Sequence, residues 1–200
     1  MTSCHLKSFV TALGLAASLV AASATAATVA FSGTRSNNSL GATPNGRCAP
    51  ALTINFGPGA LAASGTSNLG AFSYTGSHCI AGFPPGPYSD GRFTWDFGDG
   101  TLSGTYTGLL SASGVAGQFV LSESLTFTGG TGRFDGATGT AVASGTLRFG
   151  QVGGVNVSFG EATFNGEVTA AAVPEPATWA LMLAGCGLAL AAARHQRPHR

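Results

Sequence analysis

Positive charge is scarce in the central part of this chain of 200 residues. Between residues 27 and 172 there is no lysine, and five arginines stand against seven acidic residues, which gives a net charge of −2. Binding to nucleic acid through counterion release needs several clustered cations. The absence of such a cluster argues against a nucleic-acid partner.

Motifs for catalysis or cofactor binding are also missing. The sequence has no phosphate-binding glycine loop, no paired metal-ligand motif and no nucleophile–base–acid set. Asp90, Asp96 and Asp99 lie close together, but their spacing does not fit a calcium loop of the EF-hand type. Asp99 stands between two glycines, which is typical of a turn. We therefore expect no metal and no cofactor, and we favour a protein that is not an enzyme.

Long apolar runs occur only at the two ends of the chain. Lys7 precedes an apolar stretch from Phe9 to Val20, and small residues follow up to Ala26. This order is typical of a secretory signal peptide. We predict a signal peptide over residues 1–26, removed by signal peptidase after Ala24 or Ala26, and an exported domain over residues 27–172.

The last 28 residues form a tail, residues 173–200, with three consecutive parts. A proline-flanked motif comes first, an apolar run over residues 177–193 follows, and a basic end without acidic residues closes the chain. The motif residues are Val173, Pro174, Glu175 and Pro176, and the basic residues are Arg194, Arg197 and Arg200. The prolines favour an extended backbone, the apolar run can form a membrane helix, and arginines favour the cytoplasmic side.

This tail resembles the PEP-CTERM sorting tail of exported proteins of Gram-negative bacteria, which an exosortase recognises. The resemblance implies a precursor held at the inner membrane and processing near the motif, followed by release to the cell envelope or the exterior. A helix over residues 177–193 would be about 25 Å long, which is shorter than a hydrocarbon core of about 30 Å. We therefore expect a temporary membrane contact.

Cysteine is scarce as well, with four residues in the chain. Cys4 lies in the predicted signal peptide and Cys186 in the apolar run of the tail, which leaves Cys48 and Cys79 in the exported domain. An oxidising compartment permits a disulfide, and these two residues allow one pairing. Closing a loop of about 30 residues would stabilise the fold by a few kcal/mol. A metal site is the alternative, but His78 is the one histidine nearby.

The exported domain shows short runs in which apolar residues alternate with serine or threonine, separated by glycine and proline. This pattern is typical of strands with one buried face. The predicted strands are residues 28–34, 51–56, 69–80, 92–97, 101–110, 118–128, 137–149 and 155–168. We expect an all-β fold of about eight antiparallel strands closed into a small barrel, because closure removes exposed edges. A two-sheet sandwich is the alternative.

Some of these segments resemble known families. Residues 125–139, 69–78 and 100–108 are similar to parts of small exported bacterial β-proteins. The Gly-Gly-Thr-Gly-x-Phe turn at residues 129–134 resembles that of allene-oxide-cyclase-like and dirigent barrels. The resemblance implies a calycin-like barrel of about eight strands, and no catalytic residue of those families has a match in this chain.

A competing resemblance concerns residues 93–101, which read FTWDFGDGT. They are similar to the signature of PKD domains, which are immunoglobulin-like modules of surface proteins. In that family a histidine-containing strand normally follows the signature. In this chain Gly104-Thr105-Tyr106 follows directly instead. A PKD-like adhesion module is therefore an alternative fold and function.

Glu123 and His78 are the candidate chemical groups. Strict alternation places Glu123 on an otherwise apolar strand face with Leu121 and Leu125, and His78 on a face with Phe72 and Tyr74. A buried carboxylate must be neutralised, paired or hydrogen-bonded. If both residues point into one barrel mouth, they form a minimal acid–base pair. We favour the alternative in which His78 lies in water at a strand end and Glu123 pairs with Arg133 or Arg148.

Together these observations favour a non-enzymatic, exosortase-sorted protein of the envelope or extracellular matrix, associated with exopolysaccharide or a biofilm. The expected partners are signal peptidase, an exosortase, the membrane during a transient stage, and exopolysaccharide. A barrel that binds or isomerises a small apolar ligand is the main alternative. Glu123 and His78 are the residues that motivate it.

Overall fold

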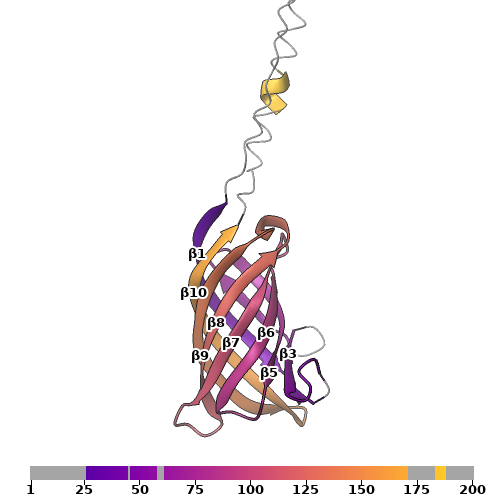
Figure 1. Ribbon diagram of the computed structural model, residues 1–200, viewed down its shortest axis with the longest axis vertical. Helices are drawn as coiled ribbons and strands as arrows, with labels where there is room; N and C mark the ends of the chain where they lie inside the picture. The colour runs from indigo at the N-terminus through magenta and orange to yellow at the C-terminus, as the bar shows by residue number, and fades with distance from the viewer. Residues whose placement is uncertain (1–25, 45, 58–60, 171–182, 188–200) are drawn as a thin grey trace, which may run out of the picture.

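A closed antiparallel β-barrel makes up the exported domain (Figure 1). The structure is a computed structural model that describes residues 26–44, 46–57, 61–170 and 183–187. The strands are β1 (Ala27–Ser39), β2 (Ala42–Thr43), β3 (Leu52–Phe56), β4 (Ser64–Ser67), β5 (Gly70–Ile80), β6 (Gly86–Asp96), β7 (Thr101–Ala112), β8 (Gln118–Gly130), β9 (Thr138–Val152) and β10 (Val155–Ala170). Their order is β2-β3-β5-β4-β1-β10-β9-β8-β7-β6, and pairing of β5 with β6 closes the ring.

The ring has eight strand positions, as the sequence predicts. β4 pairs with the first residues of β5, β3 pairs with the last residues of β5, and both lie along the same edge of that strand. β4 also pairs with β1, so β3 and β4 share one position in the wall. The closed ring confirms the barrel and excludes the sandwich, including the PKD-like alternative.

Two strands, β1 and β6, are extended by five or more residues at one end relative to the prediction, whereas β7, β8, β9 and β10 gain two or three residues. β1 continues to Ser39 because Arg35 and the residues after it pair with β10. β6 begins at Gly86, inside the proline-rich segment between the predicted strands at residues 69–80 and 92–97. The inward residues in both extensions are partly polar, so they do not show the apolar alternation that marks a strand. Strands β2 and β4 were not predicted, because each is too short to show an alternation of apolar and polar residues.

The two ends of the barrel differ. Ala27 and Ala170 pair with each other at one end, named here the proximal end, which also holds the connections β4–β5, β6–β7 and β8–β9 (Figure 1). The connections that follow β1, β5, β7 and β9 form the opposite, distal end. The predicted turn at Gly98-Asp99-Gly100 is present at the proximal end, where the Phe97 N–H donates to the Gly100 carbonyl at 3.0 Å.

Aromatic side chains fill the proximal half of the interior. The ring centroids of Phe31, Phe127 and Phe164 lie 5.6, 5.9 and 4.9 Å from that of Trp95, and Phe72 stacks on the same indole at 4.6 Å. These five side chains are buried. Tilted and edge-on contacts at such distances add to the stabilisation from burial of apolar area.

A short 3-10 helix, η1 (Gly132–Phe134), completes this end of the core. The ring of its buried Phe134 lies 4.9 Å from that of Phe97. The proximal end is therefore closed by packed side chains.

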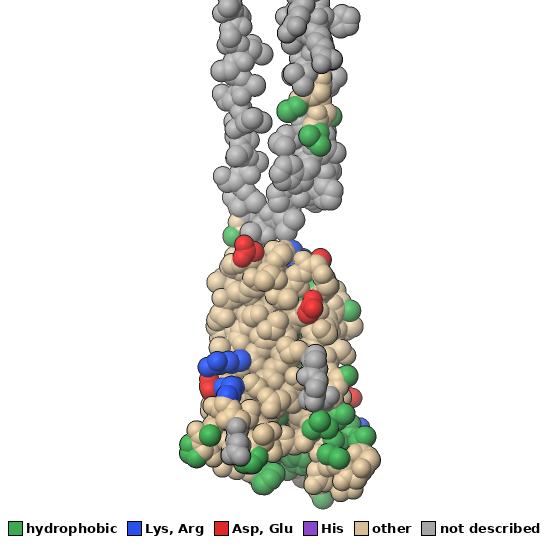
Figure 2. Space-filling view, turned by 90° about the vertical axis from the view of Figure 1, so that its right-hand side faces the viewer, with side chains coloured by type: hydrophobic (Ala, Val, Ile, Leu, Met, Phe, Trp, Pro, Cys, Tyr) green, Lys and Arg blue, Asp and Glu red, His purple; other side chains and the backbone are tan. Residues whose placement is uncertain are grey.

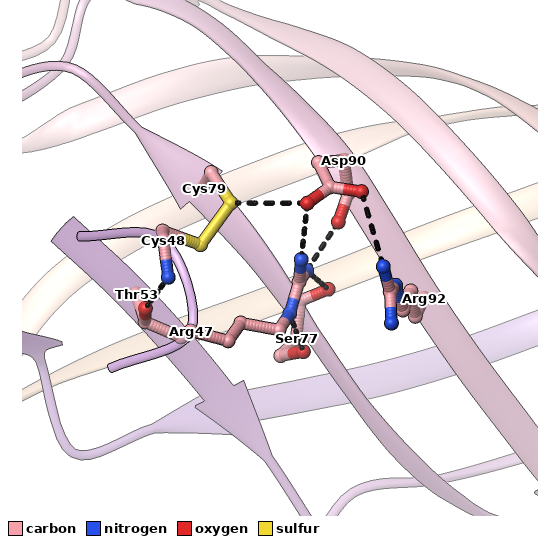
Figure 3. Close-up of polar contacts among 7 residues, drawn as sticks. All are labelled: Arg47, Cys48, Thr53, Ser77, Cys79, Asp90 and Arg92. Atoms are coloured by element: carbon pink, nitrogen blue, oxygen red, sulfur yellow. Dashed lines mark hydrogen bonds and ion pairs between the residues drawn. A yellow bond between two sulfur atoms is a disulfide. The ribbon is translucent and has the colours of Figure 1, made fainter. Parts of the chain in front are cut away.

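A disulfide fixes the segment between β2 and β3 to the barrel wall (Figure 3). It joins Cys48 to Cys79 of β5, as the sequence predicts, with their Cα atoms 5.5 Å apart. Beside it, Arg47 donates to the Ser77 hydroxyl at 2.9 Å and also bonds the carboxylate and the carbonyl of Asp90. One covalent link and one guanidinium thus hold the same segment.

The predicted targeting segments lie mostly outside the described residues. This applies to the signal peptide, to the motif at residues 173–176, to the basic end at residues 194–200 and to most of the predicted helix at 177–193. Residues 183–187 are helical. Within the described ranges there is no helix long and apolar enough to cross a membrane.

Candidate functional site

A cavity of about 70 Å³ lies inside the distal end of the barrel. Its walls are mainly apolar, and the inward side chains that form them are Ile54, Phe56, Ile80, Leu110, Leu121 and Leu147. Phe83 and Phe149 line its opening and are 77% and 48% exposed. We name this cavity the distal pocket. Its walls suit an apolar molecule.

A buried ion pair lies beneath the distal pocket. Arg35 of β1 pairs with Glu123 of β8, and the two side chains are only 1% and 2% exposed. Tyr88 of β6 donates a hydrogen bond to Glu123 Oε1 at 2.6 Å. The carboxylate therefore has both an opposite charge and a hydroxyl donor, which offsets the cost of its burial.

The sheet register explains how Tyr88 reaches Glu123. Tyr88 lies opposite Gly108 of β7, and Gly108 lies opposite Glu123 of β8. A Cβ on Gly108 would lie 2.1 Å from the Tyr88 ring. The glycine therefore allows the tyrosine to cross the intervening strand.

His78 lies on the wall of the same pocket. Its ring stacks on Tyr88 with centroids 4.4 Å apart, and Nδ1 forms a hydrogen bond with the Tyr106 hydroxyl at 2.9 Å. Burial lowers the pKa of His78 to about 3, and the nearby positive charges of Arg35 and Arg47 act in the same direction. The imidazole is therefore neutral at ordinary pH.

The two tyrosines remain protonated. Burial raises the pKa of Tyr88 and of Tyr106 above the usual value, against the opposing effect of the Arg35 charge. Each therefore keeps a hydroxyl that can donate a hydrogen bond. Apart from the compensated ion pair, the site holds neutral polar groups.

The structure brings the two sequence candidates into one cavity but changes their partners. Glu123 pairs with Arg35 and not with Arg133 or Arg148, and His78 is buried and not in water. The expected partner of Glu123 and the expected exposure of His78 are therefore both wrong. The expected inward faces of β5 and β8 are correct, because His78 and Glu123 are both buried among their apolar neighbours.

Sequence reasoning missed Arg35, Tyr88 and Tyr106 as parts of the site. Tyr88 follows a run of prolines, and Arg35 begins a polar stretch that looks like a loop. Tyr106 lies in the predicted strand at residues 101–110, and its alternation with Leu102 and Leu110 is the signal that places its ring on the inward face.

The acidic residues that resemble calcium ligands have other roles. Asp99 pairs with Arg133 at 3.2 Å in the proximal turn, and Asp90 is held by Arg47. In the part of the chain that the structure describes, no group of three or more histidine, cysteine or acidic side chains could hold a metal ion.

Comparison with known proteins identifies the tail. Residues 172–197 match the family model of the PEP-CTERM protein-sorting motif, as the predicted tail at 173–200 requires. The motif indicates an exported protein with a membrane-anchored precursor, and it implies processing by an exosortase. A search of curated proteins finds no match.

Two solved structures that match this chain are dirigent proteins. The pterocarpan synthase dirigent protein GePTS1 shares 14% sequence identity at a TM-score of 0.46, over 74% of this chain and 88% of that chain. The pterocarpan synthase dirigent protein PsPTS1 shares 12% at a TM-score of 0.43, over 76% of this chain and 99% of that chain. Dirigent proteins are thus among the solved structures that match this chain.

The buried ion pair leads to a first prediction. Glu123→Leu leaves the Arg35 charge buried without a partner, so we expect the free energy of unfolding to fall by about 3–5 kcal/mol. The double variant Arg35→Met/Glu123→Leu removes both charges and should recover most of that loss. Urea unfolding measures both values.

Asp99→Asn, which breaks an exposed ion pair, is the control and should change stability by less than about 1 kcal/mol. A double variant no more stable than Glu123→Leu would contradict the prediction.

The lowered pKa of His78 leads to a second prediction. The unfolded chain binds a proton at this residue below about pH 6.5, whereas the folded chain binds it only near pH 3. The contribution of neutral His78 to the free energy of unfolding is therefore fully present above about pH 6.5. It decreases as the pH falls toward 3, by up to about 1.4 kcal/mol per pH unit.

The comparison of wild type with His78→Gln isolates this contribution from that of the carboxylates. Chemical unfolding between pH 7 and pH 4 should give a shallower pH dependence for the variant. Parallel curves for the two proteins would show that His78 does not titrate as described.

Proposed function

We propose that this protein is a non-enzymatic component of the cell envelope or extracellular matrix whose barrel binds a small, uncharged, largely apolar ligand in the distal pocket. The observation that carries the binding role is the pocket itself, with apolar walls above a compensated polar layer. Association with exopolysaccharide remains part of the proposal, and the sorting motif supports it.

The charge balance of the site favours an uncharged ligand. The charges of Arg35 and Glu123 compensate each other, and the Tyr88 hydroxyl donates a further hydrogen bond to the Glu123 carboxylate. His78 carries no charge at neutral pH. A charged ligand would lose its hydration in the pocket without gaining a free opposite charge there.

The same geometry favours binding over catalysis. A general base works best when its pKa is near the operating pH, and the pKa of His78 is about 3. Glu123 is held by an arginine and a tyrosine, so a proton transfer would have to break the ion pair. Isomerisation of a bound ligand is the second candidate, because Glu123 and His78 line one cavity.

The position of the pocket also suits a protein held by its C-terminus. Strand β10 ends at the proximal end of the barrel (Figure 1). The residues that line the opening of the pocket, Phe83 and Phe149, belong to the distal end. In the view of Figure 2, hydrophobic side chains gather toward the distal end of the barrel. A ligand can therefore enter from the side opposite the attachment point.

Sorting gives a third prediction. Expression in a host with an exosortase should yield a mature protein that lacks the tail, whereas a host without the enzyme should retain the longer membrane-bound form. Mass spectrometry after membrane fractionation measures this difference. Pro174→Ala/Pro176→Ala is the matched variant and should stay unprocessed in both hosts. An identical mature mass of the wild-type protein in the two hosts would refute exosortase processing.

Ligand binding gives a fourth prediction. The neutral fluorescent probe N-phenyl-1-naphthylamine should bind the protein isolated from its exporting host and gain fluorescence. Leu110→Trp fills the pocket and should weaken binding by about tenfold or more, because Leu110 is 7% exposed and lines the cavity. Leu109→Trp alters the neighbouring, 46% exposed side chain and should bind normally.

Thermal unfolding of both variants shows whether each keeps its fold. Failure of the wild-type protein to bind the probe, or equal binding by the two variants, would count against the distal pocket as a binding site.

A further inference from the structure

The side-chain amide of Asn37 is a buried polar group that the ion pair does not use. Asn37 lies on the inward face of β1 and lines the distal pocket, with 3% of the residue exposed. Its Oδ1 is buried and accepts no hydrogen bond from any described residue. A buried amide oxygen without a donor costs free energy. The pocket wall therefore contains an amide whose oxygen has no donor among the described residues.

The neighbouring inward residues on β1 both have polar contacts inside the barrel. Arg35 is paired with Glu123, and the Ser39 hydroxyl bonds the Ser158 hydroxyl at 2.6 Å. Asn37 stands between them on the same face. Within the described part of β1, each of the two flanking side chains thus makes a polar contact inside the barrel, although Arg35 Nε also lacks a partner, and the Asn37 oxygen is the unpartnered acceptor on this face.

The space for this amide is built into the adjacent strand. Asn37 pairs with Gly160 of β10, and a Cβ on Gly160 would lie 3.0 Å from Asn37 Nδ2 and 3.1 Å from the Asn37 carbonyl oxygen. A larger residue at Gly160 would press on the amide. The absence of a side chain there lets Asn37 lie against the wall of the pocket.

We propose that the ligand of the distal pocket carries a hydroxyl or N–H group at the end that enters the cavity, and that Asn37 Oδ1 accepts its hydrogen bond. This inference rests on the proposed binding function and specifies the ligand class. The ligand is an uncharged alcohol or amide with an apolar body. Because the cavity measures about 70 Å³, only the polar end is enclosed, and the body lies against Phe83 and Phe149 at the opening.

A matched pair of small molecules tests the requirement for a donor. 1-Hexanol and methyl pentyl ether have the same number of heavy atoms, but only the alcohol can donate a hydrogen bond. Displacement of N-phenyl-1-naphthylamine from the wild-type protein measures both affinities. We expect the alcohol to bind about tenfold more tightly, which is the effect of one net hydrogen bond to a buried acceptor.

Asn37→Leu keeps the approximate size of the side chain and removes the acceptor. In this variant the preference for the alcohol should disappear, while the affinity for the ether stays the same or increases. Its stability should equal or exceed that of the wild type, because an unpartnered amide is replaced by an apolar group. Asn165→Leu, at an exposed position on β10, is the control and should retain the preference.

The outcomes separate the two proposals. If neither molecule displaces the probe and the probe itself does not bind, the binding function fails. If alcohol and ether bind the wild-type protein equally, the pocket binds ligands but Asn37 selects none, and solvent satisfies its amide. A marked loss of stability in Asn37→Leu together with an unchanged preference would assign the amide a structural role and overturn the inference.

Discussion

The ion pair between Arg35 and Glu123 is the interaction on which the interior of this barrel depends. β1 and β8 are not neighbours in the wall, since β10 and β9 lie between them, so the pair reaches across the inside of the barrel. Neither charge is tolerable alone at that depth. On its proximal side the interior is packed with aromatic rings, and on its distal side the pocket begins. One polar contact thus separates the part of the barrel that stabilises the fold from the part that can receive a ligand.

The sequence predicts strands well where the inward residues are apolar. β8 is the clearest case, because Leu121, Leu125 and Phe127 alternate with serine and threonine and are buried as expected. The distal half of β1 was not predicted as a strand, for the opposite reason. Its inward residues are Arg35, Asn37 and Ser39, so both faces are polar and the pattern is that of a loop. The polar inward residues next to the distal pocket are therefore the reason why this half of β1 does not show the pattern of a strand.

Choice of partner is the second limit on prediction. Burial physics requires a partner for Glu123, but the identity of that partner depends on how the ring closes. Arg35 is 88 residues away in sequence and reaches Glu123 only through the barrel. Arg133 instead packs over Phe97 at the proximal end, and Arg148 packs over Phe159. The disulfide was predictable because two cysteines in the exported domain allow a single pairing, whereas five arginines allow several.

The position of the distal end is compatible with both the proposed ligand binding and membrane attachment of the precursor. Its described connections contain glycine, proline and apolar residues, and Arg47, the cation within them, is already bound to Asp90 and Ser77. The next cation, Arg148 of β9, is exposed beside Phe149 and packs over the Phe159 ring. In the proposed function, recognition depends on apolar contact at Phe83 and Phe149 and on hydrogen bonding inside the pocket. Because both barrel termini leave from the proximal end, attachment through the tail leaves these contacts accessible.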